Sequence, residues 1–277
     1  MPELPEVETV RRDLRRLVCG STVARVRVRC EAMLCGVTER RLVRALRGAT
    51  IVEIGRLGKA LILRFSSGHS LLVHFRMTGQ LYPVDTGAEL PKHTRTVFEL
   101  ADGRRLIHVD VRRLGTLELI RTEAEAEAVT LANLGPDALD APLTLTELKA
   151  SLARRKCAVK LFLLDQKIMS GVGNIYACEI LARARIAPQT PCRELTGRQA
   201  RRMLTATREV LTAAVSARGT TISDFRTGTG EAGGFQRLLT VYGREGEPCL
   251  RRGCRGTIAR IVQGQRSTYY CPRCVGG

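Results

Sequence analysis

Residues 249–274 of this chain read CLRRGCRGTIARIVQGQRSTYYCPRC. They hold two short-spaced cysteine pairs, Cys249-x4-Cys254 and Cys271-x2-Cys274, with sixteen residues between the pairs. Two such pairs at this separation are typical of a closed, tetrahedral zinc site with four thiolate ligands. The first pair is wider than the commoner two-residue spacing but stays within the range of zinc ligands. We therefore expect these four cysteines to hold one structural Zn²⁺ ion.

The segment between the pairs is predicted as a β-hairpin. Strand-like runs at Thr257–Val262 and Arg266–Tyr270 are joined by residues 263–265. A hairpin of this size cannot bury a core, so bound zinc would supply its folding energy. Arg266, beside the tip, suits insertion into a nucleic-acid groove, although a solvated Arg at a strand edge has the same sequence. The other six cysteines are expected to pack or to have no role: Cys19, Cys30, Cys35, Cys157, Cys178 and Cys192.

The first half of the chain predicts a sheet-rich domain behind one amphipathic helix. Apolar residues recur at helical spacing over residues 4–19, and Gly20 ends the pattern. Strand-like runs follow, some with alternating apolar and charged residues. The predicted strand segments are residues 25–29, Ile51–Phe65, Ser70–Met77, Thr96–Leu100, Arg105–Val109 and Thr116–Ile120. A surface helix is expected near Glu123–Ala128, rich in Glu and Ala.

From Thr144 onward the pattern becomes helical. Thr144-x-x-Glu147 and Thr196-x-x-Gln199 resemble capping boxes, and each precedes a long apolar-periodic run. Gly171-Val172-Gly173-Asn174 interrupts the first run and predicts helix, tight turn, helix. Residues 220–236 are rich in Gly and Thr without periodicity, which predicts a long loop. We expect four segments: a domain over 1–132, a linker over 133–143, a helical domain with this loop over 144–238, and a zinc finger over 239–277.

The charge balance indicates an anionic partner. Lys and Arg number 45 against 27 Asp and Glu, a net charge of +18. Nucleic acid is the simplest partner for such an excess, although a merely basic or ribosome-bound protein has a similar balance. No apolar run approaches the ~18 residues of a membrane span, and the start of the chain has acids where a signal peptide needs basic residues. We therefore expect a cytoplasmic protein with reduced cysteines.

The chain opens with Met1-Pro2-Glu3-Leu4-Pro5-Glu6-Val7-Glu8-Thr9. A small second residue favours removal of Met1, which would leave Pro2 with a free secondary amine. An α-amine has a reference pKa near ~7.7–8.0, against ~10.4 for Lys, so Pro2 would be a usable nucleophile near neutral pH. Alternatively, Pro2 and Pro5 merely start a helix, because Pro fits first-turn positions.

The chain resembles the formamidopyrimidine-DNA glycosylases, bacterial bifunctional enzymes that remove oxidised purines. The resemblance spans the chain, and the opening octet and the Gly-x-Gly-Asn-Ile-Tyr stretch are its most specific parts. It rests on residues 2–9, Gly58-Lys59, His74–Gly79, Asp110–Gly115, Leu164-Asp165-Gln166, Gly171–Ala177, Val241–Gly246 and the two cysteine pairs. It implies an N-terminal β-sandwich flanked by helices, a helical domain with a helix–two-turns–helix element, and a zinc finger, with double-stranded DNA bound in the cleft between the halves.

The resemblance also implies roles for individual residues. Pro2 would attack C1′ of the damaged nucleoside, with Glu3 as the acid that helps to open the sugar and with Lys59 and Arg266 at the lesion phosphates. Four residues are expected around the flipped base: Glu6, Thr220, Thr221 and Ser223. The expected DNA contacts are His74, Met77, Arg112, Leu114, Lys160, Asn174 and Tyr242. From pattern alone, Glu6 could stabilise the helix dipole, Met77 could be a core residue and Asn174 could be a helix N-cap.

The chain departs from the family pattern at a few positions. Leu114 stands where family members commonly have Phe, so it can insert as an apolar wedge but cannot stack. Val111 replaces a family Pro, and Gly233-Gly234 replaces a commoner Gly-aromatic pair. We expect excision of 8-oxoguanine and formamidopyrimidines with β,δ-elimination in base excision repair, by a monomer associated with the bacterial nucleoid. The alternatives are an endonuclease VIII-like glycosylase for oxidised pyrimidines and a non-catalytic, damage-binding zinc protein.

Overall fold

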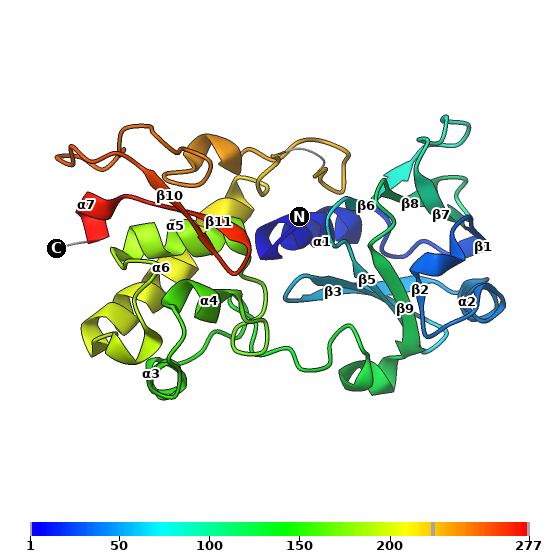
Figure 1. The fold of residues 1–277 in the computed structure, drawn as a ribbon. Coiled ribbons are helices and arrows are strands. Elements are labelled where there is room, and N and C mark those ends of the chain that lie inside the picture. Colours follow the sequence, from blue (N-terminus) through cyan, green and yellow to red (C-terminus); the bar gives the residue numbers. More distant parts are fainter. Residues whose placement is uncertain (1, 223–224, 276–277) are drawn as a thin grey trace. The chain divides into compact units, whose positions relative to one another are not determined.

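The computed structural model describes residues 2–222 and 225–275. These residues divide into two compact units (Figure 1). The first unit comprises residues 1–132 together with 217–234, and the second comprises residues 133–216 together with 235–277. The two units are described in turn below. The four-segment division expected from the sequence stays a prediction.

The first unit begins with α1, Leu4–Leu17, as the apolar periodicity predicted. Its buried face consists of Leu4, Val7, Val10 and Leu14, each at most 1 % exposed. Pro5 lies in the first helical turn, where its missing N–H has no partner to lose. The helix packs on strands of both sheets of this unit, so burial of one face fixes the position of its N-terminal end.

Two sheets form the body of the first unit. The four-stranded sheet has the order β1-β7-β8-β6, and the five-stranded sheet has the order β2-β9-β5-β4-β3, with only the short β2 pairing in parallel. The strands are β1 Val23–Val28, β2 Leu34–Cys35, β3 Ile51–Leu57, β4 Ala60–Phe65, β5 His69–His74, β6 Gly79–Val84, β7 Thr94–Leu100, β8 Arg105–Asp110 and β9 Thr116–Arg121.

One apolar core joins the two sheets. Leu61 and Leu71 of the five-stranded sheet belong to the same buried cluster as Phe98 and Leu106 of the four-stranded sheet. The helix α2, Glu39–Leu46, adds Leu42 and Leu46 to this core. The α+β class with an N-terminal β-sandwich flanked by helices is therefore confirmed. Such a core supplies a rigid frame for side chains carried on the loops and on α1.

Two local predictions differ from the structure. The apolar run over residues 51–65 is two strands, because Gly58 and Lys59 form the turn between β3 and β4. Gly58 has a positive φ of 55°, which glycine tolerates in a tight turn. The expected helix near residues 123–128 is the 3₁₀ segment η2, Thr122–Glu127, and another 3₁₀ segment, η1, covers Glu31–Met33.

His108 on β8 is a buried polar residue in the four-stranded sheet. It is fully buried, and within the described residues neither of its ring nitrogens has a hydrogen-bond partner. Burial lowers the pKa of His108 to about 4; the charge of Arg95 lowers it further, while that of Asp110 opposes the shift. His108 is therefore neutral in the folded protein down to acidic pH, whereas the unfolded chain protonates it near its usual pKa of ~6.5.

We expect this difference to make the protein less stable at acidic pH. The pKa of His108 is lower in the folded protein than in the unfolded chain, so the folded protein is fully stable with respect to this residue above pH ~6.5. As the pH falls towards ~4, the unfolded chain binds a proton that folded His108 does not, and the free energy of unfolding falls by up to about 3 kcal/mol. Urea unfolding between pH 7 and 4.5 would measure the loss, and His108→Leu should flatten the slope. A His69→Leu variant is the control on a partly exposed histidine; an unchanged slope in His108→Leu would contradict the assignment.

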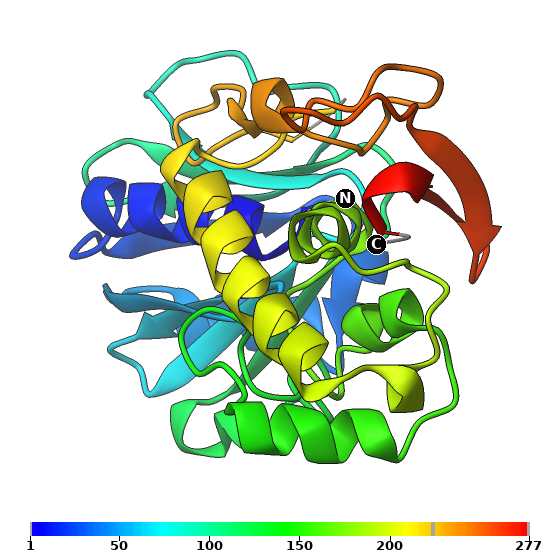
Figure 2. The same ribbon diagram turned by 90° about the vertical axis from the view of Figure 1, so that its left-hand side faces the viewer.

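The second unit is mainly helical (Figure 2). The long helix α6 packs against α5 and α3, and α4 packs against α5. Both capping boxes are confirmed: Thr144 and Glu147 cap each other, as do Thr196 and Gln199. The helical elements are α3 Leu145–Ala153, α4 Val159–Leu164, α5 Asn174–Ala184, η3 Cys192–Glu194, α6 Gly197–Ser216 and η4 Phe235–Leu238.

A hairpin of β10, Ala259–Gln263, and β11, Arg266–Tyr270, completes this unit with the short α7, Pro272–Val275. The two strands pair antiparallel, which confirms the predicted hairpin. Gly264 and Gln265 turn the chain with φ values of 53° and 59°. A Cβ atom at Gly264 would lie 2.9 Å from Cδ2 of Leu161, so the turn lies closely on α4. Among the described residues, no helix combines the length and apolar character needed to span a lipid bilayer.

Candidate functional site

The N-terminal end of α1 carries the first two predicted catalytic residues. Pro2 is buried, and Glu3, at the N-cap of α1, is 2 % exposed. The Glu3 backbone N–H donates to Oε2 of Glu6 at 2.8 Å, which completes one half of a capping box. The α1 helix dipole favours negative charge at this end. The structure therefore holds the residue after Pro2 in a fixed, largely desolvated position.

The other carboxylate oxygen of Glu6 binds a distant part of the chain. Oε1 of Glu6 accepts a hydrogen bond from the Thr220 backbone N–H at 2.6 Å. Gly219, which has a positive φ of 78°, allows this approach, because a Cβ atom there would lie 2.9 Å from the same oxygen. Glu6 thus joins the start of α1 to residues 217–234, which we call the 217–234 segment. Its carboxylate positions the backbone on both sides.

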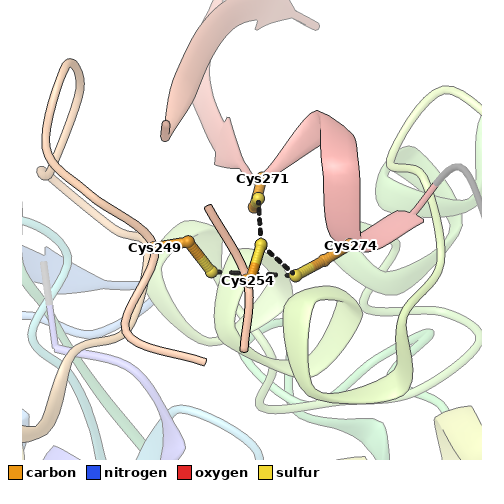
Figure 3. Close-up of side chains that lie close together, drawn as sticks. All are labelled: Cys249, Cys254, Cys271 and Cys274. Atoms are coloured by element: carbon orange, nitrogen blue, oxygen red, sulfur yellow. Dashed lines mark hydrogen bonds between the residues drawn. The ribbon is translucent and has the colours of Figure 1, made fainter. Parts of the chain in front are cut away.

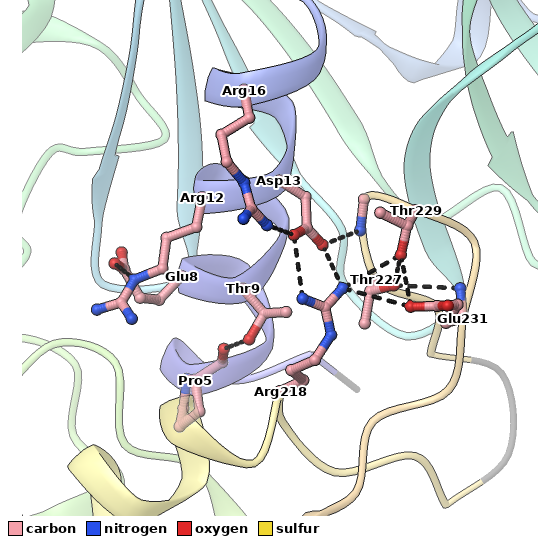
Figure 4. Close-up of polar contacts among 11 residues, drawn as sticks. Pro5, Glu8, Thr9, Arg12, Asp13, Arg16, Arg218, Thr227, Thr229 and Glu231 are labelled. Carbon is pink, nitrogen blue, oxygen red and sulfur yellow. Dashed lines mark hydrogen bonds and ion pairs between the residues drawn. The ribbon is translucent and has the colours of Figure 1, made fainter.

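Asp13 provides a second attachment for the 217–234 segment (Figure 4). The Asp13 carboxylate is 1 % exposed and accepts from both terminal nitrogens of Arg218, at 3.2 and 2.9 Å. The Gly228 backbone N–H also donates to it, at 3.1 Å. Arg218 in turn donates to Oγ1 of Thr229. Buried carboxylates require such partners, so this cluster fixes the segment to α1.

We expect Asp13→Ala to destabilise the protein measurably. The variant leaves the Gly228 N–H without its acceptor and leaves Arg218 with only Thr229 and Glu231 as partners. It should lower the free energy of unfolding by about 2 kcal/mol. Arg16→Ala is the matched control, because Arg16 also pairs with Asp13 but its side chain is 71 % exposed. That variant should change stability by less than about 0.5 kcal/mol. Equal losses in the two variants, measured by urea unfolding, would exclude the anchoring role.

Thr221 joins described parts of the 217–234 segment to one another. Oγ1 of Thr221 donates to the Phe225 carbonyl and accepts from the Gly233 N–H. Gly233 has no room for a side chain, because a Cβ atom would lie 2.3 Å from the Gly219 carbonyl oxygen. At Gly234 the nearest atom to such a Cβ is 3.2 Å away. Ser223, predicted for the same pocket, lies outside the described residues.

Lys59 is 8 % exposed and lies in the β3–β4 turn. Arg56 holds this turn, because its Nη1 donates to the Gly58 carbonyl at 3.0 Å and its Nε donates to Glu8 on α1 at 3.1 Å. Burial by itself raises the pKa of Glu8, but hydrogen bonds from Arg11 and Arg12 and the charge of Arg56 bring it down to about 2. Glu8 is therefore ionised at neutral pH and ties the Lys59 turn to the helix that carries Glu3.

His74 lies next to this turn. Ala60, the residue after Lys59, pairs with His74 across β4 and β5. Burial lowers the pKa of His74 to about 4, helped by the charges of Arg76 and Lys59. Its Nδ1 accepts from the Arg76 backbone N–H at 3.1 Å, so Nε2 carries the proton of the neutral ring. His74 can therefore act as a neutral hydrogen-bond donor at Nε2.

Two neighbouring loops present apolar side chains to solvent. Met77 is 40 % exposed and Leu114 is 45 % exposed, so the alternative that Met77 is a core residue is wrong. The buried Asp110 carboxylate accepts from the backbone N–H groups of Arg112 and Gly115, at 3.1 and 2.8 Å, and from the Thr78 hydroxyl. It thereby holds together the loop of residues 75–78, which carries Met77, and the loop of residues 111–115, which carries Leu114. The Arg112 side chain is exposed beside them.

In the second unit, two predicted residues contact strand β11 of the β10–β11 hairpin. Nδ2 of Asn174 donates to the Ser267 carbonyl at 3.0 Å, and Nζ of Lys160 donates to the same oxygen at 3.2 Å. Lys160 is fully buried and also donates to Thr268, so it supports β11 from beneath instead of facing solvent. Arg266, the residue before Ser267, is exposed. Lys160 and Asn174 therefore fix the start of β11, where Arg266 lies.

The turn before α5 is held by Gln166. Its side-chain amide donates to the carbonyls of Leu164 and Val172 and accepts from the Gly171 N–H. The N-cap of α5 is Gly173, so Asn174 is the first helical residue and its N-cap alternative is wrong. Tyr242, also predicted as a contact residue, packs edge-to-face on Tyr269 with ring centroids 5.1 Å apart.

Four cysteine sulfurs meet beside the hairpin (Figure 3). The Sγ atoms of Cys249, Cys254, Cys271 and Cys274 all lie within 4.8 Å of one another, and three of the pairs are separated by 3.4–3.7 Å. A tetrahedral ion with Zn–S bonds of ~2.3 Å needs sulfurs ~3.8 Å apart, so the geometry fits one Zn²⁺ ion. Gly256 makes room for this cluster, because a Cβ atom there would lie 2.7 Å from Sγ of Cys271.

Family models and curated relatives match this whole arrangement. Residues 1–117 match the formamidopyrimidine-DNA glycosylase N-terminal domain, residues 134–226 match its H2TH domain, and residues 246–275 match the zinc finger found in FPG and IleRS. The formamidopyrimidine-DNA glycosylase of Heliobacterium modesticaldum is 41 % identical over 99 % of both chains, and that of Ligilactobacillus salivarius is 40 % identical over 99 % of this chain and 98 % of its own.

The chain belongs to the formamidopyrimidine-DNA glycosylase family.

Solved structures of this family have the same fold. A complex of Lactococcus lactis Fpg with DNA containing an abasic site superposes with a TM-score of 0.91 and is 32 % identical, with 98 % of each chain covered. A complex of a Lactococcus lactis Fpg mutant with DNA containing Fapy-dG has a TM-score of 0.92 at 32 % identity, with 99 % of each chain covered. Family membership also confirms the assignment of the four cysteines to one structural zinc.

Sequence reasoning predicted several of these residues and missed their supports. Within the first unit the structure brings Glu3, Glu6 and Thr220 into one hydrogen-bonded cluster. Within the second unit it brings Lys160, Asn174 and the strand of Arg266 together. The supporting residues were not predicted: Glu8, Asp13, Arg56, Asp110, Gln166 and Arg218. Glu8, Asp110 and Gln166 lie in stretches that carry the family resemblance. For Asp13, Arg56 and Arg218 the only sequence signal is charge, which many surface residues share.

Proposed function

We propose that this chain is a bifunctional DNA glycosylase and AP lyase that excises oxidised purines, 8-oxoguanine and formamidopyrimidines, in base excision repair. Pro2 would be the N-terminal nucleophile and Glu3 the acid. The single observation that carries the proposal is the buried Pro2-Glu3 pair at the start of α1, with the Glu3 N–H fixed by Glu6. Removal of Met1 would make this pair an α-amine beside a carboxyl group, which is what iminium chemistry at a sugar requires.

The proposed reaction proceeds in four steps. The Pro2 nitrogen attacks C1′, the bond to the damaged base breaks, and the base leaves with a proton. The sugar ring opens as Glu3 protonates the ring oxygen, and the nitrogen lone pair forms a cationic iminium with C1′. Loss of a C2′ proton then expels the 3′ phosphate, and a second elimination expels the 5′ phosphate, which leaves a one-nucleotide gap.

Residues of both units are proposed to bind double-stranded DNA. Lys59, His74, Asn174 and Arg266 would contact phosphates, while Met77, Arg112 and Leu114 would fill the space of the extruded base. Because Lys160 is buried against β11, we assign it to supporting Arg266, with no phosphate contact of its own. Tyr242 would act beside the zinc hairpin. Glu6, Thr220, Thr221 and Ser223 would lie at the flipped base.

We expect DNA affinity to depend strongly on salt. Each neutralised phosphate releases a counterion, so three or more cationic contacts should lower the affinity more than ~10-fold between ~50 and ~200 mM salt. Fluorescence anisotropy with a labelled duplex would measure this slope. Arg266→Ala should reduce the slope by about one phosphate contact, whereas Arg16→Ala on the outer face of α1 should not. An affinity independent of salt would contradict a phosphate-based clamp.

Borohydride trapping tests the proposed chemistry. One duplex carries 8-oxoguanine opposite cytosine, and a second carries 5-hydroxyuracil, because a related Lactococcus lactis Fpg has been solved with DNA containing an oxidised pyrimidine. A stronger covalent adduct on the first duplex supports the proposal, and preference for the second indicates an endonuclease VIII-like enzyme. No adduct on either duplex, from zinc-loaded protein that lacks Met1, indicates a damage-binding protein without catalysis.

A further inference from the structure

Residues 155–160 and 188–193 lie side by side as an antiparallel pair in the second unit. Ala158 and Pro191 form a β-bridge, the Val159 N–H donates to the Thr190 carbonyl, and the Arg193 N–H donates to the Arg155 carbonyl. In this register, Cys157 lies directly opposite Cys192. The Cys192 N–H donates to the Cys157 carbonyl at 2.9 Å, which fixes the two cysteine backbones against each other.

The two sulfur atoms are already close. Sγ of Cys157 lies 3.8 Å from Sγ of Cys192. Directly opposed residues of an antiparallel pair have Cα atoms ~4.5–5.5 Å apart, which is inside the ~4.4–6.8 Å that a disulfide needs. Rotation of the side chains is therefore enough to bring the sulfurs to bonding distance, and the backbone need not move. The Cys157 side chain is exposed, whereas Cys192 is 1 % exposed.

We propose that Cys157 and Cys192 form a reversible disulfide when the protein meets a peroxide. Hydrogen peroxide oxidises the exposed Cys157 thiol to a sulfenic acid and is reduced to water. The Cys192 sulfur then attacks the Cys157 sulfur, the S–OH bond breaks, and the hydroxyl leaves with the Cys192 proton as a second water molecule. Two thiols and one peroxide thus give one disulfide and two waters, and a dithiol reductant reverses the reaction.

The unequal exposure of the two sulfurs assigns their roles. Burial and the neighbouring Cys157 raise the pKa of Cys192 in the reduced protein, so peroxide reacts with Cys192 less readily. Oxidant reaches the exposed Cys157 first, and Cys192 resolves the product. Neither belongs to the four-sulfur zinc cluster. The proposal is also independent of the DNA chemistry proposed above, since it concerns no residue of that mechanism.

The disulfide would lock the segment that leads into α4. Val159 begins α4 two residues after Cys157, and Lys160 donates to the Ser267 carbonyl beneath Arg266. The two cysteines are 35 positions apart, so a bond between them closes a long loop in the unfolded chain. We expect oxidation to raise the melting temperature of the zinc-loaded protein by roughly 5 °C.

The experiment oxidises the zinc-loaded, full-length protein with hydrogen peroxide, alkylates the remaining thiols with iodoacetamide, and maps disulfides by peptide mass spectrometry. We expect a cross-linked peptide that joins Cys157 to Cys192, its loss on treatment with dithiothreitol, and full retention of zinc, measured with a chromogenic chelator. Cys157→Ser and Cys192→Ser should each lack the cross-link and the gain in melting temperature. Cys19→Ser, on an exposed cysteine of the first unit, should keep both.

Three results would overturn the proposal. The first is a Cys157 that is alkylated in the reduced protein yet forms only sulfinic acid or intermolecular dimers on oxidation. The second is a cross-link that appears only in step with zinc release, since it would report unfolding. The third is an unchanged melting temperature after quantitative cross-linking, which would mean that the bond does not hold the α4 segment.

Discussion

A protein with one alanine inserted before Pro2 should lose the covalent DNA adduct almost completely. The insertion turns the Pro2 nitrogen into a tertiary amide without a nucleophilic lone pair, while Glu3, Glu6 and the fold remain. Removal of a catalytic nucleophile lowers rates by several orders of magnitude, so we expect at least a ~10³-fold loss in the rate of borohydride trapping on 8-oxoguanine DNA. Pro2→Gly, which keeps an α-amine at the N-terminus, should retain part of the activity.

The controls separate lost chemistry from lost structure. Both variants should bind one zinc and give the circular dichroism spectrum of the parent protein, because the buried face of α1 begins at Leu4. Their affinity for uncleaved lesion DNA, measured by anisotropy at fixed salt, should stay within a few-fold of the parent. Full trapping by the inserted variant would exclude Pro2 as the attacking amine and would direct attention to Lys59.

Loss of one zinc-binding thiolate should have a large effect on the structure of the zinc finger. Cys271 is 2 % exposed and its sulfur lies 3.7 Å from that of Cys254 at the centre of the site. Zinc binding to small zinc domains contributes on the order of 10 kcal/mol to their folding. We expect Cys271→Ala to release zinc and to unfold the β10–β11 hairpin, because the apolar cluster beside the hairpin includes all four of these cysteines.

The measurements for this variant are zinc stoichiometry, hydrogen exchange over residues 259–270, and affinity for lesion DNA. Exchange in the hairpin should become fast, and the affinity should fall ~10-fold or more because Arg266 loses its supported strand. The matched control is Cys19→Ser, which removes a thiol outside the zinc site. A hairpin that remains protected without zinc would show that its packing on α5 is sufficient for folding.

The sequence predicted the elements whose causes are local. The apolar stripe of α1, the Thr144 capping box and the cysteine spacing each lie within a few residues, and all are confirmed. The strand β6 was missed because Gly79 and Pro83 argue against a strand; the structure accommodates Pro83 because β6 is at the edge of its sheet. The helix α2 was missed because it is only eight residues long.

The supports of the candidate site could not be predicted in the same way. Glu6 and Thr220 are 214 positions apart, and Asp13 and Arg218 are 205 apart. No local pattern links such pairs, and a single sequence offers no covariation. Arg56 carries no mark that distinguishes it from the many exposed arginines of a chain with a net charge of +18. Only the folded backbone brings these residues together.

The double attachment of the 217–234 segment also has a consequence for synthesis. When residues 2–132 have left the ribosome, Glu6 and Asp13 lack the Thr220, Arg218 and Gly228 donors that they use in the finished protein. During translation α1, which follows Pro2, therefore lacks these hydrogen bonds until residues 217–234 have been synthesised. We therefore expect a fragment of residues 2–132, which keeps two carboxylates without those partners, to be less stable than the same residues in the full chain.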